Sequence, residues 1–114
     1  MITVYGIPNC DSVKKARAWL DLKGLDYAFH DFRKSGVPTA PLDEWLARFG
    51  WETVINRRGT SWRRLPAETR ETMDAATARR AILANPSLIK RPVVEHDGDT
   101  LIGFSADDWQ EALA

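Results

Sequence analysis

The sequence contains one cysteine among its 114 residues, at position 10. A single thiol cannot form an intramolecular disulfide, which excludes the disulfide-rich secreted scaffolds and is typical of a reducing compartment. We therefore expect the protein in the cytoplasm. Any redox chemistry at this thiol must take its second thiol from another molecule.

The chain also lacks an excess of charge of either sign, because Lys plus Arg and Asp plus Glu each number 16. This balance gives no electrostatic basis for binding nucleic acid or an anionic membrane surface. No apolar run approaches the roughly 20 residues that a membrane span needs. The first residues, MITVYGIPNCDS, have no basic region followed by a long apolar segment, so no signal peptide is predicted. His30 and His96 have no metal-ligand spacing with Cys10, and no metal site is expected.

The apolar content is sufficient for one folded core, since 44% of the residues are hydrophobic and 28% are charged. This composition predicts a single domain over residues 1–114. Patterns of period two and 3.6 predict strands at 2–7 and 25–32, helices at 11–23, 39–49, 75–84 and 105–113, and a hairpin over 91–104 that turns at Asp97-Gly98. Gly6 and Gly59 are predicted to lie in turns, and the basic segment 56–65 in a loop. The order β-α-β, helices, β-β-α indicates an α/β domain with a helical insertion at about 39–86.

Cys10, within GIPNCDSVKK, lies at or just before the first turn of the helix predicted at 11–23. Unpaired N–H groups and the helix dipole stabilise a thiolate there, and can lower a cysteine pKa from about 8.5 to roughly 3.5–7.5. Asp11 opposes this effect, while Lys14 and Lys15 partly offset Asp11. The alternative is a capping or packing residue, because free cysteine often fills small spaces in a core. The local sequence leaves both interpretations open.

Arg91-Pro92, at the start of the predicted hairpin, is the second informative feature. A β-α-β unit followed by β-β-α, with an X-Pro pair opening the third strand, is the arrangement of thioredoxin folds. In such a fold this bond would be a cis peptide, and its loop would face Cys10 across the end of the sheet. The Val93 backbone would then be free to pair with an extended peptide that carries a thiol. A trans proline that only begins a strand fits the pattern equally well.

Four blocks, YGIPNCDSVKKARAWL, GWETVINRRGTSWRRL, NPSLIKRPVV and LIGF, together resemble the arsenate reductase-like (ArsC/Spx) family, closest to its YffB branch. The resemblance covers essentially the whole chain. It implies a thioredoxin-like fold with a mixed sheet and a helical insertion, a nucleophilic cysteine at position 10, and no bound cofactor. Arg91 matches the family's oxyanion-binding arginine before the proline. Asn56 and Phe104 stand where two further arginines are expected, so we expect arsenate to be a poor substrate.

The resemblance implies a glutathione-dependent thiol–disulfide reductase, with Cys10 and Arg91 as catalytic residues and glutathione as a co-substrate. The residues expected to bind substrate or glutathione are Asn9, Lys14, Arg58, Arg63, Pro92 and Val93. We expect a monomer that acts on a small thiol, disulfide or oxyanion.

Two alternatives stay open. One is an arsenate or other oxyanion reductase that uses glutathione and glutaredoxin. The other is a non-enzymatic, Spx-like transcriptional regulator that binds RNA polymerase. Spx-type proteins commonly carry a Cys-x-x-Cys switch, and Val13 occupies the fourth position of that motif here. The absence of the second thiol counts against the regulator.

Overall fold

A four-stranded mixed sheet organises the computed structural model, which describes all residues from 1 to 114. The strands are β1 (Ile2–Gly6), β2 (Tyr27–Asp31), β3 (Val93–His96) and β4 (Asp99–Ile102), in the spatial order β2-β1-β3-β4. β1 is parallel to β2 and antiparallel to β3, and β3 is antiparallel to β4. The predicted β-α-β and β-β-α arrangement and the mixed sheet are confirmed.

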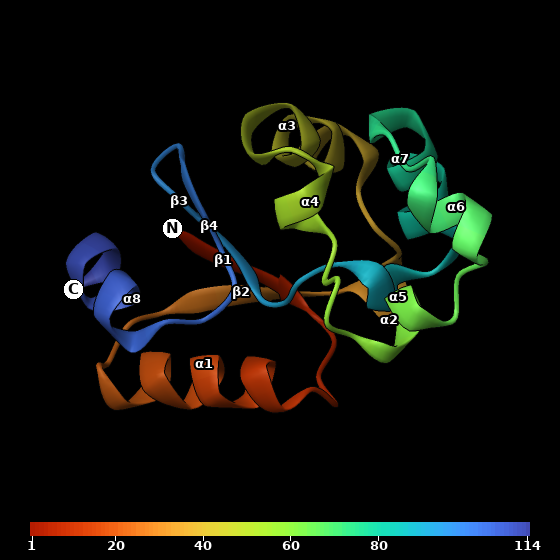
Figure 1. Ribbon diagram of the computed structural model, residues 1–114. Coiled ribbons are helices and arrows are strands. Elements are labelled where there is room, and N and C mark those ends of the chain that lie inside the picture. Colours follow the sequence, from red (N-terminus) through yellow and green to blue (C-terminus); the bar gives the residue numbers. More distant parts are fainter. The chain divides into compact units, whose positions relative to one another are not determined.

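Two helices, α1 (Asp11–Leu22) and α8 (Ala106–Leu113), lie on one side of this sheet (Figure 1). Val4 from β1, Leu20 from α1 and Trp109 from α8 are all completely buried in the core that joins them. Burial of this apolar surface is the main term that holds the helices on the sheet. α1 is thereby fixed immediately after β1 and the turn that contains the cysteine.

The ends of these elements follow local sequence signals. Gly24 has φ 68° just after α1, a conformation that glycine adopts without a steric penalty. Asp97 and Gly98 have φ 48° and 84° in the hairpin turn between β3 and β4. The Ser105 hydroxyl accepts a hydrogen bond from the backbone N–H of Asp108 at 3.4 Å and caps α8. The predicted hairpin turn at Asp97-Gly98 is confirmed.

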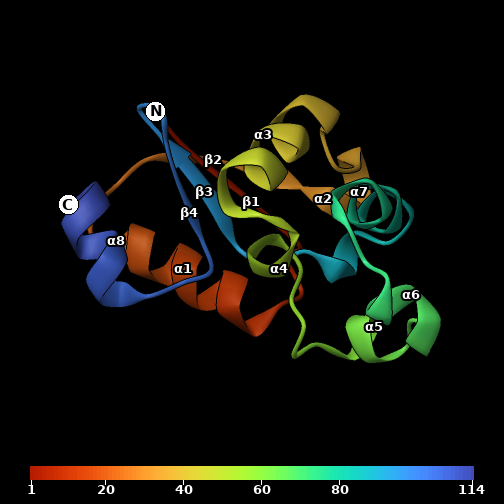
Figure 2. The same cartoon turned by 45° about the horizontal axis from the view of Figure 1, so that its top comes forward.

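Residues Ser35–Lys90 form a second compact unit, and the first consists of Met1–Lys34 together with Arg91–Ala114. The short helix α2 (Phe32–Ser35) ends at the first residue of this unit. The unit contains α3 (Thr39–Phe49), α4 (Trp51–Val54), α5 (Thr60–Arg63), α6 (Ala67–Glu71), α7 (Ala75–Ala84) and the 3-10 turn η1 (Pro86–Leu88). α3 packs against α7 (Figure 2), and the largest fully buried side chain of the unit is Trp45. The single domain with an insertion at about 39–86 stays a prediction.

The prediction of a loop over residues 56–65 is wrong in part, because this segment contains the helix α5. The Trp62 ring of this helix stacks on Trp51, with ring centroids 6.0 Å apart and planes inclined by 24°. The Arg63 guanidinium donates a hydrogen bond to the Arg58 carbonyl at 2.9 Å. These contacts join residues up to eleven positions apart, so the helix depends on packing that the local pattern does not contain.

Gly6 is the last residue of β1 rather than a turn residue, which corrects the prediction for it. A Cβ atom at this position would lie 2.8 Å from Cγ2 of Val13. Val13 is fully buried in α1, so its branched side chain has little freedom to move away. Glycine is needed here because the helix approaches the strand closely at the cysteine-containing turn.

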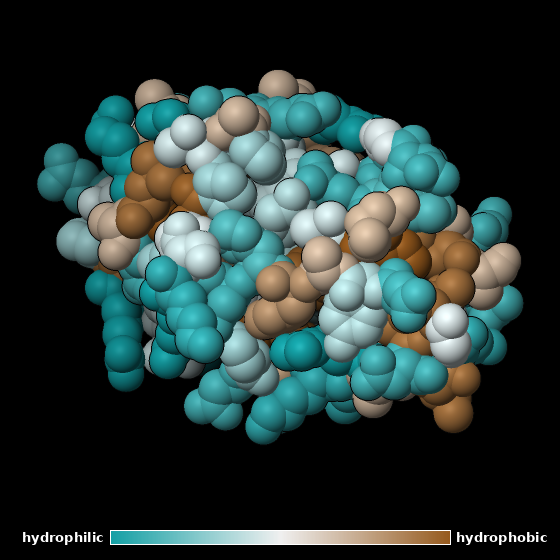
Figure 3. Space-filling model, turned by 180° about the vertical axis from the view of Figure 1, so that it is seen from behind, coloured by the Kyte–Doolittle hydropathy of each residue, from teal (hydrophilic) through white to brown (hydrophobic).

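No helix of the structure combines the length and apolar character that crossing a membrane requires. The large hydrophobic side chains that are exposed are Met1, Leu22 and Leu83. Figure 3 shows one face of the molecule, on which hydrophobic side chains form separate patches among hydrophilic ones.

Candidate functional site

The sheet brings Cys10 and Arg91 to the same end of the first unit. Tyr5, near the end of β1, is the register partner of Val93, the first residue of β3. Because the two strands are antiparallel, the turn that leaves β1 and the residues that enter β3 lie at one edge of the sheet. Cys10 follows that turn, and Arg91 precedes β3.

Cys10 is the N-cap residue of α1, with φ −131° and ψ 130°. Its carbonyl accepts the first helical hydrogen bond, from the N–H of Lys14 at 2.9 Å. The neutral thiol makes no capping hydrogen bond of ordinary geometry. The backbone N–H groups of Val13 and Ser12 nevertheless lie where they stabilise the negative charge of a thiolate.

The pKa of the Cys10 thiol is lowered from its ordinary value. Burial is the largest single influence and raises this pKa, because it removes the thiolate from water. Acting together, the N–H of Val13, the hydrogen bond and charge of the Arg91 guanidinium, and the N–H of Ser12 outweigh burial. The thiol is half-buried, so it remains accessible while its thiolate is stabilised.

Arg91 and Pro92 are joined by a cis peptide bond, as the thioredoxin-like arrangement predicts. Pro92 is buried, and its carbonyl accepts a hydrogen bond from the N–H of Gly103 at 2.8 Å. The half-buried Arg91 side chain donates a hydrogen bond to the Cys10 sulfur. Arg91, the residue before the proline, therefore supplies the positive charge that stabilises the thiolate.

The other binding residues predicted in the first unit, Asn9, Lys14 and Val93, differ in their exposure. Asn9 is exposed in the turn before Cys10, and Lys14 is exposed on α1. Neither Lys14 nor Asp11 is among the groups that shift the pKa of the thiol. Val93 is completely buried and pairs with β1 on one side and β4 on the other, so its backbone lies at no open strand edge. The expected free backbone at Val93 is thus not found.

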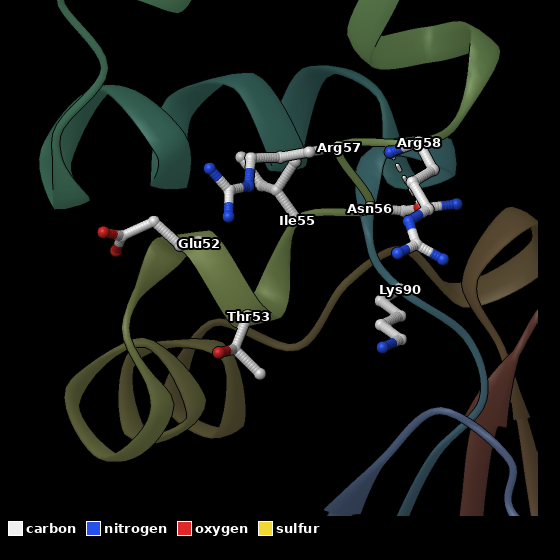
Figure 4. A pocket seen from close by; sticks show the side chains of 7 residues that line it. All are labelled: Glu52, Thr53, Ile55, Asn56, Arg57, Arg58 and Lys90. Carbon is white, nitrogen blue, oxygen red and sulfur yellow. Dashed lines mark hydrogen bonds between the residues drawn. The ribbon is translucent and has the colours of Figure 1, made fainter.

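Arg58 belongs to the second unit and lines a cavity of about 560 Å³ there, the basic pocket. The residues that line it are Glu52, Thr53, Ile55, Asn56, Arg57, Arg58 and Lys90. In Figure 4, Arg58, Asn56 and Lys90 lie at one end of the pocket, while the Arg57 side chain extends toward the end where Glu52 lies. Arg63 does not line the pocket.

Lys90 is a candidate binding residue that sequence reasoning missed. It precedes Arg91, and nothing in its spacing relates it to the basic segment more than thirty residues earlier. Only the pairing of residues 54–56 with 88–90 brings it to the pocket. The one available signal in the sequence was that Lys90 is a basic residue next to the predicted proline loop. This signal does not show which residues Lys90 lies beside.

The two positions at which the family's arginines are absent differ in their surroundings. Asn56 lines the basic pocket and carries an amide rather than a charge. Phe104 packs edge-on against Trp109, with ring centroids 5.0 Å apart, and extends the core under α8. Phe104 therefore offers no hydrogen-bond donor to an oxyanion.

Groups of three or more His, Cys, Asp or Glu side chains suitable for holding a metal ion do not occur in the structure. The chemistry that the arrangement offers is that of a lone thiolate beside a guanidinium. Such a pair can attack a disulfide sulfur and hold an anionic group of the reactant.

Comparison with known proteins places this geometry in a family. The family model of the ArsC family matches residues 5–112. The solved structure of a YffB protein has a TM-score of 0.95 and 46% identity, with all of both chains covered. An arsenate reductase (ArsC) related protein from Brucella melitensis has a TM-score of 0.79 and 48% identity over 98% of this chain and 92% of that one. The global transcriptional regulator Spx of Streptococcus pyogenes is 30% identical over 121 aligned residues, which include all of this chain and 86% of the regulator.

These matches agree with the fold. The chain belongs to the ArsC family, whose members resemble arsenate reductase, and it has the thioredoxin-like fold.

Proposed function

We propose that the protein is a glutathione-dependent thiol–disulfide reductase with Cys10 as its nucleophile. The observation that carries the proposal is the lowered pKa of the Cys10 thiol, which Arg91 and the first turn of α1 produce together against the effect of burial. The thiolate is the reactive form of cysteine, so a lowered pKa increases the reactive fraction near neutral pH. Membership of the ArsC family supports thiol-based reduction at the level of the family.

The reaction would run in two exchanges. The Cys10 thiolate attacks the glutathione sulfur of a mixed disulfide between a substrate and glutathione, which forms a Cys10–glutathione disulfide and releases the substrate as a thiolate that takes up a proton. A second glutathione thiolate then attacks the glutathione sulfur of this intermediate. Oxidised glutathione leaves, and the Cys10 thiolate is restored. Each cycle consumes one free glutathione, and the one disulfide bond passes from the mixed disulfide to oxidised glutathione, so that the substrate leaves as a thiol.

Arg91 would serve both exchanges. It stabilises the Cys10 thiolate as the attacking group, and again as the leaving group in the second exchange. Its planar fork can also hold a carboxylate of glutathione. Asn9 precedes Cys10 in the chain and Pro92 follows Arg91, so both are candidate contacts for the reactant, and Arg58 and Arg63 are further candidate contacts for glutathione.

The experiment is a pair of measurements on the wild type and on Cys10→Ser. Incubation of the wild type with oxidised glutathione should give an intact mass increased by one glutathione, and free glutathione should reverse it. Reduction of a glutathionylated peptide, coupled to glutathione reductase, should be lost in Cys10→Ser and retained in Ser12→Ala, which removes a neighbouring hydroxyl but keeps the N–H. A wild type that forms no adduct, or a Cys10→Ser variant with full activity, would overturn the proposal.

A regulatory role is the second candidate, because the Spx regulator matches the chain along its whole length. Such a role would act through surface contacts, including a contact with RNA polymerase, and would tolerate Cys10→Ser. Binding of the Cys10→Ser variant to polymerase with unchanged affinity, together with no reductase activity in the wild type, would favour this role.

A further inference from the structure

The basic pocket is built by two segments that pair as a short antiparallel ladder within the second unit. The N–H of Lys90 donates to the Val54 carbonyl at 2.8 Å, and the N–H of Asn56 donates to the Leu88 carbonyl at 2.8 Å. An isolated bridge joins Ile55 and Ile89 between them. Side chains alternate along extended chains, so diagonal neighbours on a ladder share a face. Asn56 and Lys90 therefore project on the same side.

A tight turn holds Arg58 beside Asn56. The Asn56 side-chain oxygen accepts a hydrogen bond from the N–H of Arg58 at 3.2 Å, and the Asn56 carbonyl accepts one from the N–H of Gly59 at 3.2 Å. A Cβ atom at Gly59 would lie 3.0 Å from the Asn56 amide nitrogen, so glycine leaves room for this amide. The Arg63 guanidinium donates a hydrogen bond to the Arg58 carbonyl at 2.9 Å. The backbone thus determines the position of Arg58 without using its guanidinium.

The pocket carries positive charge that no side chain of the protein neutralises. Arg57, Arg58 and Lys90 are exposed, and none of them forms an ion pair. The Arg57 guanidinium lies 5.8 Å from the centre of the Trp51 ring, which leaves its charge in place. The one carboxylate of the pocket, that of Glu52, lies at the end toward which Arg57 extends (Figure 4). The end formed by Asn56, Arg58 and Lys90 consequently carries two positive charges and no carboxylate.

We propose that the basic pocket binds a small, multiply charged anion through carboxylate or phosphate oxygens, with Arg58, Lys90 and the Asn56 amide as its contacts. The guanidinium offers a planar fork that matches either group, and the ammonium adds a point charge. The Asn56 oxygen already accepts a hydrogen bond, which directs its amide NH₂ to act as a donor. A cavity of about 560 Å³ is in the range of small-ligand sites.

This inference deepens the proposed function, in which Arg58 is a candidate glutathione contact, by adding Lys90 and Asn56 and the anionic class of the ligand; binding at the pocket itself needs no thiol. Two sources offer the same chemistry: inorganic phosphate, and a tripeptide such as glutathione that carries two carboxylates. The test separates them by using inorganic phosphate and S-methylglutathione, whose sulfur is blocked and cannot exchange with Cys10.

The experiment is a titration of the ¹⁵N-labelled full chain with each probe, followed through the backbone amides of Asn56, Arg58 and Lys90. The disrupting variants are Arg58→Gln and Lys90→Gln, which keep the backbone hydrogen bonds that build the pocket. The matched control is Arg64→Gln, which removes the same charge from an exposed position outside the pocket. A parallel titration of Cys10→Ser shows whether binding is independent of the thiol.

We expect saturable shifts at the three amides, and binding about tenfold weaker in each disrupting variant, as loss of one charged hydrogen bond implies. Binding should be unchanged in Arg64→Gln and Cys10→Ser, and weaker at high salt. Preference for S-methylglutathione would support a carboxylate ligand, and preference for phosphate a phosphate ligand. Absence of saturable shifts with both probes, or equal weakening in Arg64→Gln, would overturn the proposal. A failure of Cys10 to react with oxidised glutathione refutes the proposed function alone, so the two failures are distinguishable.

Discussion

The contribution of Arg91 to the reactivity of Cys10 can be measured with Arg91→Met, which removes the charge and keeps a stem of similar length. An opposite charge close to a thiolate favours the charged form and lowers the pKa of the thiol. The Cys10 thiol is half-buried and water screens the charge in part, so we expect the pKa of Cys10 to rise in the variant toward its ordinary value.

A rise in the pKa changes the rate in opposite directions at the two ends of the pH range. For each unit of rise, the thiolate fraction below both pKa values falls about tenfold, but each thiolate becomes about threefold more nucleophilic, since the Brønsted coefficient is about 0.4–0.5. The variant should therefore react more slowly than the wild type in acid and faster on the alkaline plateau, by about threefold for each unit. The two pH–rate profiles should cross.

The assay is the release of absorbing thione from a neutral aromatic disulfide, followed by stopped flow from acid to alkaline pH. A neutral reagent removes any attraction between Arg91 and the probe. Arg64→Met serves as the control for loss of an exposed charge, and its profile should overlay that of the wild type. An Arg91→Met profile that is parallel to the wild type at every pH, with no crossing, would refute the assignment of thiolate stabilisation to Arg91.

Three further results are expected. Cys10→Ser should lower the free energy of unfolding only at higher pH, because the native pKa of Cys10 is lowered. The stability that the thiolate contributes is complete above the unfolded pKa of about 8.5, and it is lost as the pH falls through the native pKa. Urea midpoints at several pH values test this, and a pH-independent difference contradicts it. Gly6→Ala should destabilise the fold by about 1–3 kcal/mol in urea unfolding, because its Cβ would lie 2.8 Å from a buried side chain of α1, and an unchanged midpoint would contradict this packing. Arsenate reduction with glutathione and glutaredoxin should stay at background, because Asn56 and Phe104 stand where two oxyanion-binding arginines are expected. Efficient turnover would show that these two residues have been matched to the wrong positions of the family.

The parts of the fold that were predictable are those in which a single residue satisfies a local geometric requirement. Gly24 ends α1 because its positive φ is costly for other residues. Asp97-Gly98 turns the hairpin, and Ser105 caps α8, for equally local reasons. Cys10 at the N-cap of α1 was predictable in the same way, since the end of β1 and the start of the helical pattern enclose it.

The short helices of the second unit and the basic pocket were not predictable, because long-range contacts determine them. α5 has a single turn and no buried residue, and it is held by the stacking of Trp62 on Trp51. Lys90 reaches the pocket only through the ladder that pairs its segment with Asn56. Lys90 and Asn56 lie more than thirty positions apart in the sequence, which is beyond the range of any periodic pattern.

Val13 shows why the second thiol must come from another molecule. Its side chain is completely buried against Gly6, where a strand and a helix approach each other closely, so this position belongs to the core. Its N–H also helps to lower the pKa of Cys10. The residue that would carry the resolving thiol of a Cys-x-x-Cys pair thus packs the site and polarises the remaining thiol. Because one thiol cannot store the two electrons that reduction of a disulfide requires, any reduction of a disulfide through Cys10 must consume an external thiol.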